Sequence, residues 1–340
     1  MSLIKRRSEY NFPERVSSAS HKINDPYSKR FQEIRHNLGS AKNSLRQTSL
    51  EKGFSDSLKK ILDDKNRSDN KSGIWIWNLA DLPNTSAKLD EFLKVANQKG
   101  FTRLYVNGHP NITLNQDTNQ FKNLIEKSAN YNIKIDILLG NPEWVSDPNQ
   151  AKVFKEKFLP SVINFWKECP DNLKPGLHLD IEPHCLPQWQ SDQENLLTKT
   201  MSLYDDVNDI LKKEKANIEL SADIPHWWDN IKQKNGKTAF ENISDKVSNV
   251  LIMSYGDTSH KVKALSREEL LSSNYHKVIT AIETDGAVLI GWDNNNNEIK
   301  GEDLKQATNN IFQTTKKLSI HPRPNTDLLQ ILSSLSDNQN

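Results

Sequence analysis

Short apolar runs alternate with amphipathic stretches from residue 73 to residue 335. Eight of the runs are rich in β-branched and aromatic residues, which is typical of buried strands. They recur about every 30 to 40 residues, which is the spacing of successive βα units. The predicted strands cover residues 73–78, 103–108, 134–140, 176–183, 218–225, 249–255, 278–284 and 318–321.

The stretches between the strands have the apolar period of a helix. In the first of them, residues 84–100, Leu89, Phe92 and Ala96 share one stripe and Gly100 supplies a C-terminal stop. Residues 287–292 are strand-like and end in a turn at 293–297, which predicts an insertion after the seventh strand. The other predicted helices cover 116–131, 147–166 with a bend at Pro160, 192–214, 239–247, 266–275, 302–317 and 326–335.

Eight βα units predict the α/β class and a closed (β/α)8 TIM-type barrel over residues 73–340. A doubly wound open sheet is the alternative architecture. The sequence has no G-x-G-x-x-G loop after the first strand and no Walker-type lysine motif, so the usual nucleotide-binding reading of an open sheet is not supported. We therefore favour the barrel.

A polar, basic N-terminal arm precedes the barrel. Residues 1–72 carry 16 Lys and Arg against 9 Asp and Glu, an excess of seven positive charges. The best helix candidate in the arm is 40–64. We expect the arm to be partly disordered, with its helix docked on the barrel; the alternative is that the arm contacts a partner or a membrane surface.

The bulk composition excludes some classes of protein. The formal net charge is +1 and the barrel region is acidic, so we expect no nucleic-acid partner. No stretch is apolar enough for an integral membrane segment, and the N-terminus lacks the apolar run of a signal peptide. We therefore predict a soluble protein, cytoplasmic unless a non-classical route exports it. The two cysteines, Cys169 and Cys185, do not require a disulfide.

The most informative stretch is the fourth predicted strand and the residues that follow it. His178, Asp180 and Glu182 alternate with leucine and isoleucine, so they share one face of the strand. The flanking helices predict a buried parallel strand. Two carboxylates on the inner face of such a strand cost free energy unless they are hydrogen-bonded, paired or used in chemistry. We favour a functional role for both over a structural polar cluster.

The barrel rule places active-site residues at the C-terminal ends of the strands. Carboxylates and tryptophans gather at these ends, and tryptophan rings suit stacking against sugar rings. We therefore predict a carbohydrate substrate. The predicted substrate-binding residues are Trp75, Trp77, Asn107, His109, Trp144, His178, Asp223, His226, Trp227, Trp228, Asp257 and His321.

Glycosidic cleavage needs a proton donor and a group that stabilises the cationic transition state. Glu182 lies nearer the rim and is the predicted acid, with Asp180 orienting it or sharing its proton. Tyr255 and Glu283 reach the same space from the sixth and seventh strands, and Glu283 permits a mechanism with a carboxylate nucleophile. The predicted catalytic residues are Asp180, Glu182, Tyr255 and Glu283.

Two short motifs, Asp180-x-Glu182 after the fourth strand and Met253-Ser-Tyr255 after the sixth, resemble those of the chitinase-like glycoside hydrolase superfamily. The resemblance implies that Glu182 is the acid and that Tyr255 assists. It also implies that Asp180 positions the N-acetyl group of the substrate as an internal nucleophile. His178 stands where the family usually has its first aspartate, and Gly256 follows Tyr255 where the family usually has Asp or Asn.

Two other functions remain open at this point. A metal-dependent hydrolase or phosphodiesterase would draw its ligands from His109, His178, Asp180, Glu182, His184 and His226. No compact metal-binding spacing supports it, so we predict neither a metal nor another cofactor. The second alternative is a non-catalytic barrel that binds a glycan or a protein.

Overall fold

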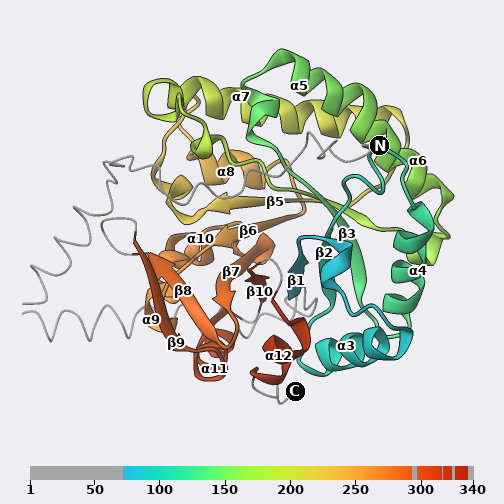
Figure 1. Cartoon of the computed structure of the whole chain (residues 1–340). Helices are drawn as coiled ribbons and strands as arrows, with labels where there is room; N and C mark the ends of the chain where they lie inside the picture. The colour runs from blue at the N-terminus through green and yellow to red at the C-terminus, as the bar shows by residue number, and fades with distance from the viewer. Residues whose placement is uncertain (1–71, 293–296, 316, 324–325, 336–340) are drawn as a thin grey trace, which may run out of the picture. The chain divides into compact units, whose positions relative to one another are not determined.

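The computed structural model describes residues 72–292, 297–315, 317–323 and 326–335 (Figure 1). The predicted arm at 1–72 and its helix therefore lie outside the described residues, apart from Ser72. Eight strands form a closed parallel barrel in the order β1 to β7 followed by β10, which pairs with both β7 and β1. The predicted barrel is thus confirmed. Its strands are β1 (Gly73–Ile76), β2 (Arg103–Asn107), β3 (Lys134–Leu139), β4 (Gly176–Leu179), β5 (Leu220–Pro225), β6 (Asn249–Met253), β7 (Val278–Asp285) and β10 (Leu318–Pro322).

The predicted insertion after the seventh strand is an antiparallel hairpin of β8 (Val288–Trp292) and β9 (Glu298–Asp303), which extends the sheet from β7. The prediction of a helix beginning at Glu302 was wrong. Glu302 belongs to β9, which pairs with β8, and its backbone N–H donates to the Asp257 carbonyl oxygen at 2.7 Å. The helix begins two residues later, at Leu304.

Helices connect the strands on the outside of the barrel (Figure 1). The first, α3, begins after Thr85, whose side chain accepts a hydrogen bond from the Lys88 N–H, and ends before Gly100 at a φ of +86°. Such capping matches the sequence signals for a helix start and stop. The helices are α3 (Ser86–Gln98), α4 (Thr118–Ala129), α5 (Pro148–Val153), α6 (Leu159–Glu168), α7 (Trp189–Lys213), α8 (Ala239–Ser244), α9 (Ser259–Leu265), α10 (Arg267–Leu271), α11 (Leu304–Thr315) and α12 (Leu328–Ser333).

Two predicted helices differ from the observed ones. The helix expected at 147–166 is divided into α5 and α6 by a π-helical turn, η4 (Phe154–Phe158), which ends just before Pro160. Pro160 has no backbone N–H to donate to the preceding turn, and its ring would clash with a carbonyl there. A wider turn before it relieves this conflict. The helix expected at 266–275 is the shorter α10, and a second helix that was not expected, α9, precedes it and begins after the Thr258 cap.

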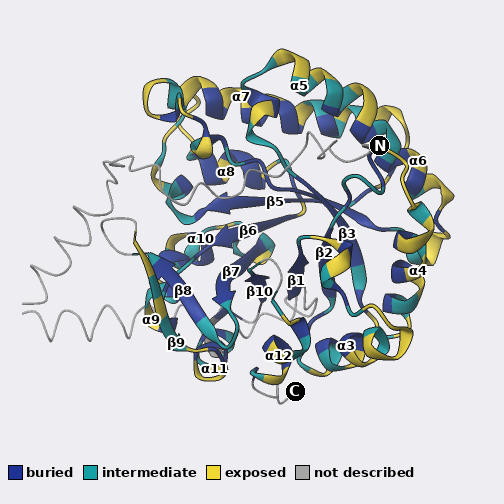
Figure 2. Cartoon of the chain, in the orientation of Figure 1, coloured by how far each residue is buried: buried dark blue, intermediate teal, exposed yellow. Residues whose placement is uncertain are grey.

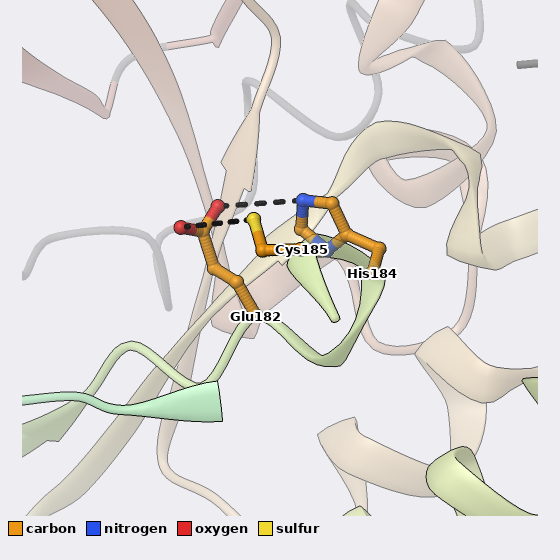
Figure 3. A group of neighbouring side chains, drawn as sticks. All are labelled: Glu182, His184 and Cys185. Carbon is orange, nitrogen blue, oxygen red and sulfur yellow. Dashed lines mark hydrogen bonds and ion pairs between the residues drawn. The ribbon is translucent and has the colours of Figure 1, made fainter. Parts of the chain in front are cut away.

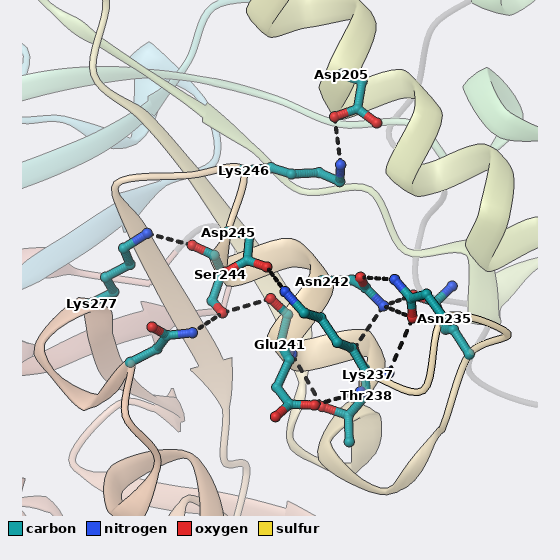
Figure 4. Close-up of polar contacts among 12 residues, drawn as sticks. Asp205, Asn235, Lys237, Thr238, Glu241, Asn242, Ser244, Asp245, Lys246 and Lys277 are labelled. Carbon is teal, nitrogen blue, oxygen red and sulfur yellow. Dashed lines mark hydrogen bonds and ion pairs between the residues drawn. The ribbon is translucent and has the colours of Figure 1, made fainter.

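The short helix α8 is held at both ends by side chains (Figure 4). Thr238 and Glu241 form a reciprocal capping box, with the Glu241 N–H donating to the Thr238 hydroxyl at 3.1 Å. At its other end the Lys277 ammonium donates to the Ser244 carbonyl oxygen. These contacts fasten α8 to the segment that enters β7.

The interior of the barrel is apolar in the middle and polar at both ends. Trp75, Tyr105, Leu138, Leu251 and Ile279 form a buried cluster in the middle. All the barrel strands are buried, whereas the helices have one exposed face (Figure 2). Among the described residues, no helix combines the length and apolar character needed to cross a bilayer.

A charged network fills the end of the barrel where the strands begin. The Arg103 guanidinium donates to Asp136 at 2.6 Å and to Glu219 at 2.8 Å. Lys134 and Asn249 also donate to Glu219, at 2.9 and 2.8 Å. The Arg103 and Asp136 side chains are 8% and 1% exposed, so this pair is buried. We expect the network to serve stability, since chemistry in such barrels occurs at the opposite end.

Candidate active site

The centre of the barrel interior, where β4 ends, holds an imidazole and a carboxyl group in direct contact. His178 Nε2 lies 2.7 Å from Asp223 Oδ2, and His178 Nδ1 lies 2.7 Å from the Ser221 hydroxyl. Burial lowers the pKa of His178 to about 3. Burial, together with the nearby Glu182 carboxylate, raises the pKa of Asp223 well above its usual value. Both shifts favour the neutral forms, so the His178–Asp223 hydrogen bond links β4 to β5 without placing a charge in the interior.

Asp180 continues from β4 at a point where two strands come unusually close. Its N–H still donates to the Leu139 carbonyl oxygen at 2.9 Å. A Cβ atom at Gly140 would lie 2.1 Å from the Asp180 backbone oxygen, so only glycine fits there. The buried Tyr204 hydroxyl on α7 donates to the Leu179 carbonyl oxygen at 3.1 Å. These contacts fix the backbone of Asp180, whose residue exposure is 7%.

Glu182 opens the short turn η6 (Pro183–Cys185) and is more accessible than Asp180. Its side chain is 23% exposed. One carboxylate oxygen lies 3.5 Å from His184 Nε2, and the other is 4.0 Å from the Cys185 sulfur (Figure 3). The rings of His184, Trp189 and Trp227 pack against one another beside this turn. Glu182 is thus a carboxylate near solvent with aromatic rings next to it.

A second group of side chains comes from β6, β7 and β10. The Tyr255 hydroxyl lies 2.7 Å from His321 Nδ1, and the His321 ring stacks on Trp75 with centroids 4.1 Å apart. Glu283 is the register partner of His321 across the β7–β10 pair and is 7% exposed. The sequence-predicted Tyr255, Glu283 and His321 therefore lie on neighbouring strand ends, over the buried Trp75.

The end of β1 is linked to its two neighbours. The Trp77 indole N–H donates to the Pro322 carbonyl oxygen at 2.6 Å, and the Asn107 amide donates to the Trp77 carbonyl oxygen at 3.1 Å. His109 Nδ1 lies 2.6 Å from the Thr113 hydroxyl, and burial lowers its pKa. Trp77 and Asn107 thus hold three strand ends together, whereas His109 contacts Thr113 in its own loop and the ring of Phe158.

The other predicted binding residues lie in packing contacts. Trp144 stacks on Phe154 and lines a cavity of about 180 Å³ between α5 and α7. Trp228 is 1% exposed. Asp257 pairs with Lys261 at 3.1 Å and abuts the β8–β9 hairpin, where Gly291 and Gly301 leave room for it. His226 is also enclosed, and burial lowers its pKa to about 3, with the Lys261 charge contributing.

Several contributors were absent from the sequence-based site. Ser221 contacts His178, and Tyr204 donates to the end of β4. Neither residue belongs to a motif that singles it out. Cys185 did have a signal, because it follows His184 and stands three positions after Glu182. Of the six metal ligands considered from sequence, only Glu182 and His184 belong to a described cluster of three ligand-type side chains, and Cys185 completes it.

Comparisons with known proteins agree on the fold. No protein-family model matches the sequence, and no curated protein sequence matches it significantly. The C-terminal domain of an inferred chitinase from Desulfitobacterium hafniense DCB-2 is similar in structure, with a TM-score of 0.50 at 11% identity, covering 79% of this chain and 100% of that one. A chitinase from Bacteroides thetaiotaomicron gives a TM-score of 0.50 at 12% identity, covering 79% of this chain and 98% of that one. At this level of identity the likeness shows a shared (β/α)8 barrel fold.

Proposed function

We propose that this chain, whose fold is that of the chitinase-like (β/α)8 barrels, hydrolyses glycosidic bonds with Glu182 as the general acid. One observation carries the proposal: Glu182 follows β4, whose four residues are all buried, and yet 23% of the Glu182 side chain is exposed. Asp180 and Glu283 are both buried, with residue exposures of 7%. A proton donor must reach the leaving oxygen of a bound glycan, and Glu182 is the accessible carboxyl group of the three.

The proposed reaction assigns different work to each side chain. Glu182 gives its proton to the glycosidic oxygen as the bond to the anomeric carbon breaks, and later takes a proton from the attacking water. Asp180 holds the substrate's N-acetyl group, whose carbonyl oxygen attacks the anomeric carbon. The Tyr255 hydroxyl, fixed by His321, donates to that oxygen. The alternative nucleophile is Glu283, in which case no N-acetyl group is needed.

The substrate class we propose is a glycan that contains N-acetylhexosamine. The chitinase fold and the Asp180-x-Glu182 pair support this choice. The rings of Trp189 and Trp227 next to Glu182 supply flat faces of the kind that sugar rings contact.

The test is a hydrolysis assay of the full chain on N-acetylglucosamine oligosaccharides and on matched glucose oligosaccharides, with a chelator present. We expect cleavage of the N-acetylated series only. Cleavage of both series would indicate that Glu283, rather than the N-acetyl group of the substrate, is the nucleophile. No cleavage of either series would refute glycoside hydrolysis, and activity that the chelator removes would favour a metal-dependent hydrolase.

The contact between β3 and β4 gives a more local prediction. Gly140→Ala places a methyl group against the Asp180 backbone oxygen, which cannot move without shifting the end of β4. A displacement of about 1 Å in a catalytic group costs roughly 100-fold in rate, so we expect a loss of that order in kcat. Gly236→Ala is the control, because no atom lies within 4 Å of the added carbon. It should lower the melting temperature through its φ of +82° and leave kcat unchanged. Equal kcat values in both variants would contradict the prediction.

A further inference from the structure

Three different metal-ligating side chains meet on the turn after β4. The carboxylate of Glu182, the imidazole of His184 and the thiol of Cys185 place their ligand atoms within 4.8 Å of one another (Figure 3). They occupy positions 182, 184 and 185, and the intervening Pro183 begins the short turn η6. No other group of three such side chains meets this criterion in the described part of the chain.

The spacing of these atoms matches a tetrahedral ion. Zinc binds carboxylate oxygen and imidazole nitrogen at about 2.0–2.2 Å and thiolate sulfur at about 2.3 Å. Tetrahedral geometry then sets neighbouring ligand atoms about 3.3–3.8 Å apart. His184 Nε2 lies 3.5 Å from one Glu182 oxygen, the Cys185 sulfur lies 4.0 Å from the other, and the three ligand atoms are all within 4.8 Å of one another. Binding an ion therefore requires the side chains to move by up to about 1 Å.

Accessibility and ligand type narrow the class of ion. Cys185 is exposed, and the Glu182 and His184 side chains are 23% and 21% exposed, so an ion can enter from solvent. Nitrogen and sulfur ligands favour zinc over magnesium or calcium, which prefer oxygen. Three protein ligands leave the fourth position to water, as in accessible zinc sites.

We propose that Glu182, His184 and Cys185 bind a zinc ion, and that zinc binding switches off the barrel's hydrolytic activity. The inhibitory part rests on the function proposed above. A carboxylate that coordinates zinc cannot carry a proton to the leaving oxygen, so the general acid is lost while the ion is bound. Zinc would displace the thiol proton of Cys185, which is released to solvent.

The binding test uses the metal-free full chain titrated with Zn²⁺, and with Co²⁺ as a spectroscopic probe of thiolate coordination. We expect one ion per chain and a thiolate-to-cobalt charge-transfer band in the near ultraviolet. Cys185→Ser should abolish the band and weaken zinc binding by more than about tenfold. Even replacing a residue that only hydrogen-bonds to a metal ligand lowers metal affinity about 10–100-fold. Cys169→Ser is the matched control and should bind normally, because Cys169 is the buried thiol at the end of α6. Absence of binding to the unaltered chain, or equal binding by the Cys185 variant, would overturn the zinc site.

The inhibition test measures hydrolysis over a range of Zn²⁺ concentrations up to saturation. The unaltered enzyme and Cys169→Ser should lose activity at the same zinc concentration, whereas Cys185→Ser should need more than about tenfold more zinc for the same loss. Full activity of the unaltered enzyme with one zinc bound would refute the switch. If zinc binds through Cys185 but the metal-free chain cleaves no glycan, the proposed function fails and the zinc site stands, so the two failures are distinguishable.

Discussion

Glu182→Gln is expected to reduce kcat for glycoside hydrolysis by about 10² to 10⁴, the range that a positioned general acid contributes. Glutamine has the same shape and keeps the contacts of the η6 turn, but its amide has no acidic proton to give to the leaving oxygen. KM should change little, because the substitution removes an interaction made in the transition state. The measurement is steady-state hydrolysis of the best N-acetylglucosamine oligosaccharide, in chelator.

The matched control is Glu168→Gln on α6. Its side chain is 62% exposed and pairs with Lys122 on the surface, so neither kcat nor KM should change. Both variants should unfold at the same denaturant concentration as the unaltered chain, which separates a chemical effect from a folding effect. A Glu182 variant that retains normal kcat would disprove the assignment of the acid and leave only the fold.

Arg103→Met is expected to lower the free energy of unfolding by about 3–5 kcal/mol, the usual cost of removing one partner from a buried ion pair. Methionine fills much of the same volume, but Asp136 and Glu219 lose their shared cation. Lys134 and Asn249 still reach Glu219, whereas Asp136, among the residues that the structure describes, forms its ion pair with Arg103. Urea unfolding of the full chain at neutral pH measures the loss.

Lys122→Met removes a surface ion pair with Glu168 and provides the control. Exposed pairs contribute about 0–1 kcal/mol, so its unfolding midpoint should move far less. A loss below about 1 kcal/mol in Arg103→Met would show that the network at the start of the strands contributes little to stability.

The same network makes the free energy of unfolding depend on pH in the acidic range. Arg103 and Lys134 outweigh the effect of burial and hold the pKa of Glu219 far below its usual 4.5. The unfolded chain takes up a proton near pH 4.5 and the folded chain does not. The contribution of Glu219 is therefore complete above that pH and declines as the pH falls further. Arg103→Met removes part of this decline, and urea titrations between pH 7 and pH 3 will show it as a shallower slope.

Much of the barrel could be predicted because its strands are buried on both sides and read as continuous apolar runs. The β9 strand was missed because Glu298 and Lys300 are polar, and because it lies against Asp257, which is distant in the sequence. The π-helical turn before Pro160 was anticipated only as a bend. Phe154 and Phe158 are buried in this turn, and the proline alone did not indicate that the turn would widen.

The candidate site was predicted less completely, because side-chain partners across strands depend on register. The alternation of His178, Asp180 and Glu182 indicated one inward face, but nothing in it showed that His178 would be tied to Ser221 and Asp223 on the next strand. Tryptophans at strand ends were treated alike. The structure separates the enclosed Trp75, Trp144 and Trp228 from the more accessible Trp227.

The pairing of β10 with both β1 and β7 has a consequence for synthesis of the chain. Before Leu318–Pro322 leaves the ribosome, β1 and β7 each have an edge whose backbone N–H and C=O groups are not yet paired with β10. Open edges of this kind invite pairing with other chains. A nascent chain stalled shortly before residue 318 should therefore need chaperone protection, and adding only the final strand should release it.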